Sequence, residues 1–328
     1  MEVVPDLRHA LDEALQAIPP ATLTRAVHEL SQRYRAEYAT GQTRFTRSPQ
    51  DVVAYAAYRL PATFGALCAV LAATQDRRPD WKPRRLLDVG AGPGAAMWAA
   101  VEMWTSLDEL KLIERDEHMI RFGQRLALHS ESSAICSASW KQQDVLADWT
   151  ESEHDIVVAS YLLGELPAQS RAGLVDRLWS LTGDVLVLVE PGTPRGFSLV
   201  REARDRLRIG GAYTLAPCPH NDACPMRDDD WCHFAQRIPR SRVHRTAKRA
   251  QLSYEDEKYS YVALSRQPGV PFGARIIRHP QIRPGRISLR LSTLTGVADE
   301  TVTRSAGERF RRARDASWGG TWPDQETR

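Results

Sequence analysis

Residues 86–94, with the sequence LLDVGAGPG, decide the fold, because an apolar run ends here in three alternating glycines before a helix-forming segment. Gly90, Gly92 and Gly94 let the backbone turn tightly and leave main-chain N–H groups open to a ligand. Asp88 adds a carboxyl group two positions before the first glycine. The stretch therefore predicts a ligand-binding turn between the first strand and the following helix of a parallel sheet.

Short apolar runs that end in Gly, Asp, Glu or Pro recur after this turn, with helical stretches between them. They are LDELKLIERD at 107–116, EHDIVVASYLLGEL at 153–166 and GDVLVLVEPG at 183–192. Strands that alternate with helices indicate a doubly wound α/β sheet covered on both faces. We expect a helical N-terminal layer at 1–80, a Rossmann-like domain at 81–212, a cysteine-containing and basic segment at 213–257, and at 258–328 a small β appendage with a basic C-terminal helix.

The composition is that of a globular chain, since 42% of the 328 residues are hydrophobic and 26% are charged. The first residues alternate charged and apolar groups, and no secretory signal is visible. The apolar-rich run from Pro61 is too short to span a bilayer, and Pro61 should kink or split its helix. We therefore expect no membrane partner and place the protein in the cytoplasm, or in an equivalent reducing compartment.

Two acidic residues extend the predicted ligand site beyond the glycine turn. Glu114 ends the second strand, where a carboxylate can accept hydrogen bonds from both ribose hydroxyls of a nucleoside. Asp144 follows the third strand and could approach an adenine amino group, although a turn or cap role is an equal alternative. The D-x-G-x-G-x-G form resembles the first motif of the Rossmann-like, class I S-adenosylmethionine-dependent methyltransferases. The G-x-G-x-x-G spacing of a dinucleotide site is not present.

The end of the fourth strand, VVASYLLGELP at 157–167, is where such methyltransferases carry catalytic residues. It contains neither an Asn-Pro-Pro-aromatic signature nor a thiol. Tyr161 and Glu165 are its polar candidates, with core or cap roles as the alternatives. The sequence favours methyltransferase activity but assigns no catalytic residue, so a catalytically silent protein is an open alternative.

Three of the five cysteines lie in CPHNDACPMRDDDWCHF at 218–234. Cys218, Cys224 and Cys232 have the spacing C-x5-C-x7-C, whereas structural zinc sites favour pairs two to four residues apart. Irregular spacing, with Pro219 and Pro225 after two of the thiols, suits a loop around an iron–sulfur cluster. A clustered set of thiols in a reducing compartment favours metal binding over disulfides.

Basic residues concentrate after this segment. Residues 233–298 contain thirteen Lys or Arg against three Asp or Glu, which is a net charge of +10 in a chain whose total is +3. Such segregation favours a polyanionic partner. The residues that we predict to bind RNA phosphates without reading sequence are Arg240, Arg242, Arg245, Lys248 and Arg249. No DNA partner is expected.

The order of these motifs resembles that of a known family. The glycine turn is followed by VEPGTPRGF, APCPHNDACP, DWCHFAQRIPRSRVHRTAK, EDEKYSYV and RFRRARDASWG. From about residue 48 to residue 323 the chain resembles the small-ribosomal-subunit methyltransferase-like family, which has yeast and human mitochondrial members. The resemblance implies a methyltransferase domain, S-adenosylmethionine binding, a [4Fe-4S] cluster, and attachment to the small ribosomal subunit or its RNA during assembly.

The chain departs from the family at the fourth cysteine, which lies in a strand of the C-terminal appendage. The matching segment is GRISLRLSTLTG, where Ser292, or less favourably Thr293, takes the place of that cysteine. His220, His233 and His244 are the other candidates for the fourth ligand. A three-cysteine cluster and a zinc ion are alternatives to the full cluster.

We therefore expect an S-adenosylmethionine-binding, methyltransferase-like protein that acts on or binds ribosomal RNA of the small subunit, in assembly or translation. A non-catalytic assembly factor with the same fold is one alternative. A small-molecule methyltransferase whose basic segment is incidental is another.

Overall fold

The computed structural model describes residues 3–16, 18–40, 48–240 and 252–323. Four helices precede the sheet: α1 (Pro5–Gln16), α2 (Pro20–Thr40), α3 (Pro49–Tyr58) and α4 (Leu60–Gln75). Ser48 caps α3, and Pro61 lies in the first turn of α4, where a missing N–H costs nothing. The helical N-terminal layer and the split at Pro61 are as predicted.

No single helix in the described ranges is both long and apolar enough to cross a bilayer. Taken together, α3 and α4 would meet the length and composition, with a bend of 49° between them.

The central sheet has the strand order β3-β2-β1-β4-β5-β8-β6, and β7 pairs with β8 outside this path. Its strands are β1 (Arg85–Val89), β2 (Glu109–Glu114), β3 (Ser139–Gln142), β4 (His154–Ser160), β5 (Thr182–Pro191), β6 (Tyr213–Ala216), β7 (Phe234–Pro239) and β8 (Tyr254–Ser265). The strands β1 to β5 pair in parallel, whereas β8 runs antiparallel to both β5 and β6. The reversal of strand order at β1 and β4 creates a crevice at their carboxyl ends, where open α/β sheets bind ligands.

Both faces of the sheet are apolar, because successive residues of a strand point to opposite sides. Leu86 and Val158 lie in a core shared with α1, α3, α4, α5 (Ala95–Met103) and α6 (Glu117–Ala127). Leu87 and Val157 lie in a second core, shared with α8 (Ala168–Ser180) and α9 (Pro194–Ile209). The short helices α7 (Ser133–Cys136) and η1 (Leu163–Glu165) complete this part of the chain.

The predicted boundary at residue 212 is wrong, because the sheet is completed by later segments. Residues 258–265 were placed in the appendage, but they belong to β8, which lies between β5 and β6. Its residues 259–265 are continuously buried. A strand that is covered on both faces reads as an unbroken run of buried residues, which is the property of a central strand rather than of a small exposed sheet.

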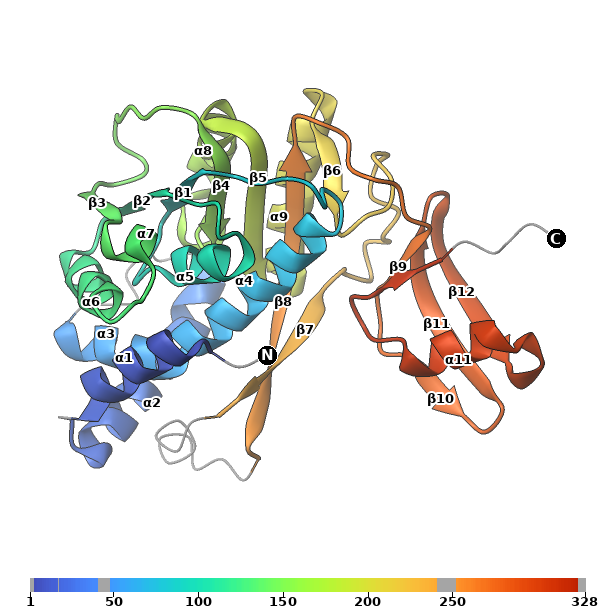
Figure 1. Ribbon diagram of the computed structural model, residues 1–328, viewed down its shortest axis with the longest axis horizontal. Helices are drawn as coiled ribbons and strands as arrows, with labels where there is room; N and C mark the ends of the chain where they lie inside the picture. The colour runs from blue at the N-terminus through green and yellow to red at the C-terminus, as the bar shows by residue number, and fades with distance from the viewer. Residues whose placement is uncertain (1–2, 17, 41–47, 241–251, 324–328) are drawn as a thin grey trace.

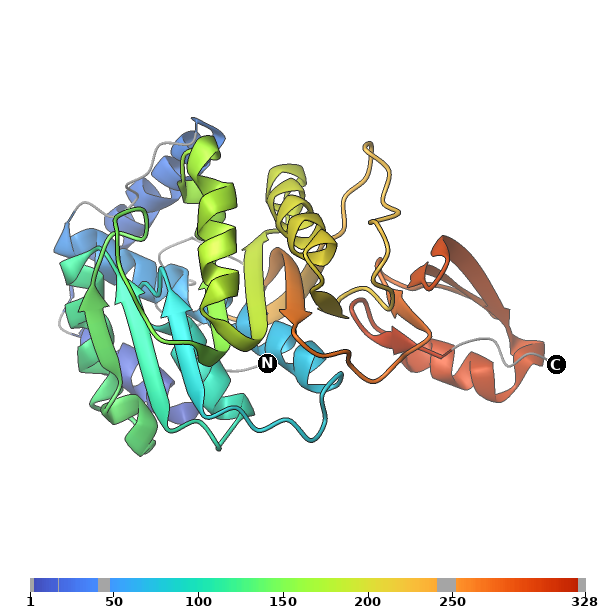
Figure 2. The same ribbon diagram turned by 90° about the horizontal axis from the view of Figure 1, so that it is seen from above.

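The appendage is a separate antiparallel sheet, seen in red beside the sheet domain in Figures 1 and 2. It contains β9 (Ala274–Ile276), β10 (Gln281–Arg283), β11 (Arg286–Thr293), β12 (Gly296–Thr303), η2 (Arg304–Ala306), α11 (Glu308–Asp315) and β13 (Thr321–Trp322). Ile287, Leu289 and Leu291 alternate along β11 and fill its core together with Trp322. The small β appendage and its basic helix are therefore confirmed.

Candidate functional site

The glycine turn after β1 has the conformation that its sequence requires. Gly90 and Gly92 have φ values of 72° and 54°, which side chains other than glycine rarely adopt. A Cβ atom on Gly90 would lie 2.9 Å from Leu162 Cδ1, so that position also lacks room. Gly94, with φ of 89°, is the N-terminal cap residue of α5. The turn thus brings backbone N–H groups to the carboxyl end of β1.

A pocket of about 330 Å³ opens at this turn, which is large enough for a small-molecule ligand. It is bounded by the ends of β1, β2 and β4 and by the start of α6. Its lining residues are Tyr55, Gly90, Gly92, Glu114, Arg115, Asp116, Glu117, His118, Met119, Gln142, Val145, Ser160, Tyr161, Leu162, Glu165 and Leu166. Four carboxyl groups against one guanidinium make the lining acidic, which suits a ligand that carries positive charge.

Glu114 lies where the sequence predicted it, at the end of β2 in the wall of the pocket. Its Oε2 accepts a hydrogen bond of 2.8 Å from Gly92 N, and its Oε1 accepts from the backbone N–H groups of Arg115 and Asp116. These bonds lower the pKa of the carboxyl group, but burial has the larger effect and raises it. The carboxylate is therefore fixed in position beside the glycine turn.

Asp88 is fully buried behind the turn, and both of its carboxyl oxygens lack a hydrogen-bond partner. Burial raises the pKa of Asp88 to about 8, and the nearby Glu114 adds to the effect. A buried carboxyl group without a partner is costly. A cationic group bound in the crevice would therefore stabilise the carboxylate form of Asp88.

Asp144 is exposed and does not line the pocket. Its Oδ1 accepts a hydrogen bond of 2.9 Å from Leu146 N, so it stabilises a turn. Of the two roles considered for Asp144, the structure shows the turn role. Gln142 and Val145, on either side of it, form this part of the wall instead.

Tyr161 forms the opposite wall in a strained conformation. Apart from glycines, it is the one described residue with a positive φ, at 57°. Such strain costs about 1–3 kcal/mol and persists where the surroundings fix the residue. The Tyr161 hydroxyl donates a hydrogen bond of 3.0 Å to Glu257, and both Glu257 oxygens accept from Arg59 at 3.0 and 3.1 Å. Burial and Glu257 raise the pKa of Tyr161 well above its usual value, so its phenol is not a base.

Glu165 lies in the 3-10 turn after β4, and its side chain reaches the pocket. Burial raises its pKa to about 8; the Arg115 guanidinium, 3.9 Å away, lowers it, and Glu114 raises it further. The turn itself is held by Glu190, which accepts hydrogen bonds from Leu163 N and Gly164 N. Glu165 is thus a carboxyl group placed to exchange a proton near neutral pH.

The sequence did not indicate the contribution of Tyr55, which comes from α3 of the N-terminal layer. Nothing in its helical surroundings distinguishes it from a core tyrosine. His118 and Met119 were also missed, although their position had a signal. Asp116 accepts hydrogen bonds from both of their N–H groups and so begins α6 directly after β2.

The three cysteines of the predicted metal site line one small cavity on the other side of β8. Cys218, Cys224 and Cys232 are joined there by Ser292 from β11 and by Tyr261 from β8. Ser292 faces this cavity because its neighbour Leu291 points into the appendage core. Residues 74 positions apart in the sequence are thereby brought together at the junction of the two sheets.

The spacing of these thiols does not suit a zinc ion. Among the described residues, His9, Glu13 and His129 are the one set of three His, Cys, Asp or Glu side chains whose donor atoms all lie within 4.8 Å. The three thiols therefore do not meet this limit. Tetrahedral Zn–S bonds of about 2.3 Å require sulfurs roughly 3.8 Å apart. An iron–sulfur cluster accepts wider spacing, because each thiolate binds a different iron atom.

Burial has the largest effect on the pKa values of the Cys218 and Cys232 thiols, and it raises both. Arg204 and Arg275 oppose the rise at Cys218, and Arg278 opposes it at Cys232. These three cations favour an anionic occupant. The donor set and its surroundings thus fit a buried, negatively charged thiolate cluster.

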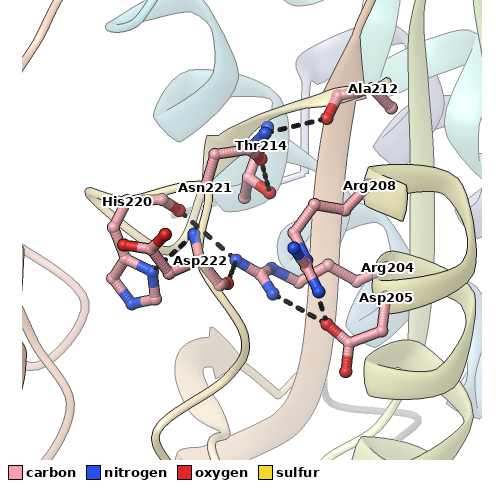
Figure 3. A network of polar contacts seen from close by, with 8 residues as sticks. All are labelled: Arg204, Asp205, Arg208, Ala212, Thr214, His220, Asn221 and Asp222. Atoms are coloured by element: carbon pink, nitrogen blue, oxygen red, sulfur yellow. Dashed lines mark hydrogen bonds and ion pairs between the residues drawn. The ribbon is translucent and has the colours of Figure 1, made fainter. Parts of the chain in front are cut away.

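The two histidine candidates that the structure describes, His220 and His233, do not line the cavity. His220 is held in a loop where its Nδ1 accepts from Asp222 N, and Arg204 donates to the carbonyl oxygens of both residues (Figure 3). His233 stacks on Trp231 with ring centroids 5.2 Å apart and meets the edge of Trp318. His244 lies outside the described residues. Ser292 is the candidate that the structure places beside the thiols.

Two arginines of the appendage tie it to the cysteine segment. Arg275 is buried, and its Nε donates a hydrogen bond of 3.0 Å to Pro217 O, next to Cys218. Arg278 forms an ion pair with Asp230 and donates to Trp231 O, next to Cys232. The thiol loop is therefore already clamped between the two sheets.

Of the five residues predicted to bind RNA, Arg240 is described. Its guanidinium lies 3.3 Å from Glu255 and donates to Leu252 O, with 14% of the side chain exposed. Arg237 of the same hairpin pairs with Asp256. Arg242, Arg245, Lys248 and Arg249 lie outside the described residues. The described base of the β7–β8 hairpin is therefore close to charge balance.

The strand order, the antiparallel β8 between β5 and β6, and the glycine turn after β1 define a class I methyltransferase fold.

The chain belongs to the family described as mitochondrial small ribosomal subunit Rsm22, whose model matches residues 49–323. It is 31% identical over 292 residues to the human ribosome assembly protein METTL17, mitochondrial, which covers 82% of this chain and 62% of METTL17. It is 25% identical to the Rsm22-cox11 tandem protein 2, mitochondrial, of Schizosaccharomyces pombe, over 88% of this chain and 45% of that protein. The chain thus spans less than two thirds of these relatives.

Solved methyltransferase structures resemble the chain more remotely. Magnesium protoporphyrin IX methyltransferase from Synechocystis PCC 6803 has 13% identity and a TM-score of 0.41, over 76% of this chain and 99% of that protein. The N-methyltransferase NodS from Bradyrhizobium japonicum has 14% identity and a TM-score of 0.39, over 62% and 96% respectively. The fold assignment rests on the strand order rather than on these likenesses.

The cytoplasmic placement is contradicted by the family. The matching family model and the human and yeast relatives are all described as mitochondrial. A globular composition and unpaired thiols are shared by proteins of several reducing compartments, so they could not distinguish between them.

Proposed function

We propose that this chain is an assembly factor of the small ribosomal subunit that binds S-adenosylmethionine in the pocket at the glycine turn. The observation that carries the proposal is the acidic pocket itself, in which Glu114 is fixed beside Gly92, while Asp88 lies buried behind the turn. S-adenosylmethionine carries a sulfonium and an ammonium group, and an acidic lining complements both. Family membership supports the ribosomal role.

Each side of the pocket has a separate task in this proposal. The Glu114 carboxylate accepts hydrogen bonds from the ribose hydroxyls, and the glycine turn lets the ligand approach the backbone. Asp88, buried behind the turn, would be stabilised in its carboxylate form by the positive charge of the ligand. Tyr55 and Tyr161 provide the aromatic walls. S-adenosylmethionine itself supplies an activated methyl group, so the protein has only to align an acceptor and, where needed, remove a proton.

Methyl transfer to RNA is a second candidate function, favoured by one observation. Glu165 lies in the pocket with its pKa raised to about 8, which is near the operating pH that suits a general base. The Tyr161 hydroxyl, by contrast, is bonded to Glu257 and holds its proton. If transfer occurs, Glu165 is therefore the residue we expect to accept the proton.

The thiol cavity is the second ligand site of the proposal. Cys218, Cys224 and Cys232 would hold a [4Fe-4S] cluster, with Ser292 beside the iron that lacks a thiolate. The cluster would supply metal–ligand bonds that join the loop to the appendage. Because Arg275 and Arg278 already clamp these parts together, the residues hold the site in place before any metal binds. Serine is a harder ligand than cysteine, so the fourth position would be the weakest.

Isothermal titration with S-adenosylmethionine, followed by co-sedimentation with small ribosomal subunits, tests the main proposal. We expect one equivalent of ligand to bind and the protein to sediment with the subunits at low salt. Incubation of the same complex with labelled S-adenosylmethionine separates the two functions, because only the second candidate transfers label to RNA. A protein that neither binds the ligand nor sediments with subunits would refute the proposal.

A further inference from the structure

A second basic feature lies far from the β7–β8 hairpin, at the turn between β10 and β11. The sequence here is Arg283-Pro284-Gly285-Arg286. Proline fixes the first central position of the turn, and Gly285, with φ of 73°, fills the second, which requires a positive φ. The two flanking arginines are consequently paired in register across the antiparallel ladder. The Cβ atoms of residues paired in this way lie about 4.5–5.5 Å apart.

Arg304, the first residue of η2, directly follows β12 and lies next to the turn. Its backbone N–H donates a hydrogen bond of 3.0 Å to Gly285 O, and Arg286 pairs with the preceding Thr303. Arg283, Arg286 and Arg304 are all exposed. Within the described part of the chain, none of the three has a carboxylate at ion-pair distance, whereas Arg290 pairs with Asp299 and Arg312 with Glu308.

Like charges placed directly opposite one another destabilise a sheet, so this arrangement has a cost that the fold itself does not require. One structural explanation is that charges on an edge strand discourage pairing with other chains. That explanation accounts for one arginine on β10. It does not account for a third arginine brought to the same end from η2, or for the lack of a carboxylate partner at all three positions among the described residues.

We propose that Arg283, Arg286 and Arg304, the appendage arginine cluster, bind the phosphate backbone of RNA. Guanidinium groups bind phosphate oxygens in a bidentate manner, and a phosphodiester chain presents such groups at regular intervals. The inference rests on the proposed association with the small subunit and adds a contact surface on the appendage to it.

The test uses full-length protein and a fluorescently labelled single-stranded oligoribonucleotide, with affinity measured by anisotropy at several salt concentrations. Three proteins are compared: the wild type, the double variant Arg283→Gln/Arg286→Gln, and the control Arg290→Gln/Arg312→Gln. Both variants lose two positive charges from the same appendage, but the control loses arginines that already have carboxylate partners. Circular dichroism confirms that both variants are folded.

We expect the cluster variant to bind RNA on the order of tenfold more weakly than the wild type at 0.1 M salt. The slope of log affinity against log salt should decrease by about 1.4, because each single-strand phosphate contact contributes about 0.7. The control should keep the slope of the wild type. Equal affinities and slopes in the two variants would overturn the inference while leaving the ribosomal role intact, and so would a cluster variant that self-associates with unchanged RNA affinity. A wild type that binds no RNA would refute both.

Discussion

The pocket at the glycine turn and the thiol cavity are built in opposite ways. The pocket is acidic and formed mostly by consecutive strand ends of one sheet, with its key carboxylate held by backbone N–H groups. The cavity is largely apolar and joins a loop of the sheet domain to a strand of the appendage. A site of the first kind follows from a short motif, whereas one of the second kind depends on how two distant segments dock. Changes at the two sites should therefore have separable effects.

The largest effect is expected from the loss of a thiol. Cys232→Ser should abolish iron binding, from about four iron atoms per chain to none, because two thiolates and two serine hydroxyls do not hold a four-iron cluster. Iron and sulfide analysis of anaerobically purified protein measures this. Cys136→Ser, at an exposed cysteine outside the cavity, is the control and should keep its iron. If Cys232→Ser also lost its affinity for S-adenosylmethionine, the two sites would not be independent.

Glu114→Gln should weaken S-adenosylmethionine binding about ten- to hundredfold, since hydrogen bonds to a charged group contribute about 1.5–3 kcal/mol. Titration calorimetry gives the change, and iron content should stay constant. Asp144→Asn is the matched control, because Asp144 stabilises a turn outside the pocket, and its affinity should stay within about twofold. The opposite order of effects would show that Asp144 rather than Glu114 contacts the ligand.

Ser292→Cys should make the cluster more resistant to air, with iron lost several-fold more slowly, because a fourth thiolate replaces a hard oxygen ligand. Absorbance decay after exposure to oxygen reports the rate. Thr293→Cys is the control, since the Thr293 hydroxyl donates to Gly296 O and the residue does not line the cavity. Equal decay in the wild type and Ser292→Cys would indicate that another residue completes the site.

Asp88→Asn should change how the stability of the ligand-free protein depends on pH. The pKa of Asp88 rises from 3.8 to about 8 on folding, so the folded state retains a proton that the unfolded state releases. Stability is therefore lost as pH rises from about 4 to about 8, and Asp88→Asn should remove this part of the loss. Its Tm should exceed that of the wild type at pH 8 by several degrees, at roughly 2–4 °C for each 1 kcal/mol. A Tm difference that is the same at pH 5 and pH 8 would contradict the assignment.

The smallest effect is expected from Arg240→Gln. Because Glu255 and Leu252 O already engage this guanidinium, RNA affinity should change by less than about twofold. The same anisotropy assay used for the appendage arginine cluster measures it. A loss of RNA affinity as large as that of Arg283→Gln/Arg286→Gln would show that the described base of the hairpin also contacts RNA.

Much of the sheet domain could be predicted from its sequence. The glycine turn and Glu114 were found because a tight turn restricts the residue type, and the carboxyl end of β2 is a position that the fold fixes. The same reasoning could not decide the role of Asp144, because a turn residue and a binding residue have the same local signal. It also missed Tyr55, because a residue brought to the pocket from a separate helical layer leaves no trace in the motif.

Distant packing explains the other differences. β8 was assigned to the wrong sheet because it follows the cysteine segment in the chain, and only its pairing with β5 and β6 shows where it lies. The high positive charge of residues 233–298 overstated the basic surface, since Asp230 and Asp299, outside that range, pair with Arg278 and Arg290. Alignment favoured Ser292 over Thr293 and left three histidines as further candidates, and only the docked appendage shows Ser292 beside the thiols.

The most direct test of the central claim is metal and sulfide analysis of wild-type protein purified without oxygen. The claim is that the loop and the appendage meet around a thiolate cluster while the pocket at the glycine turn remains a separate site. The account predicts brown protein with about four iron atoms and about four sulfides per chain, and no stoichiometric zinc. Colourless protein with one zinc ion per chain would contradict it.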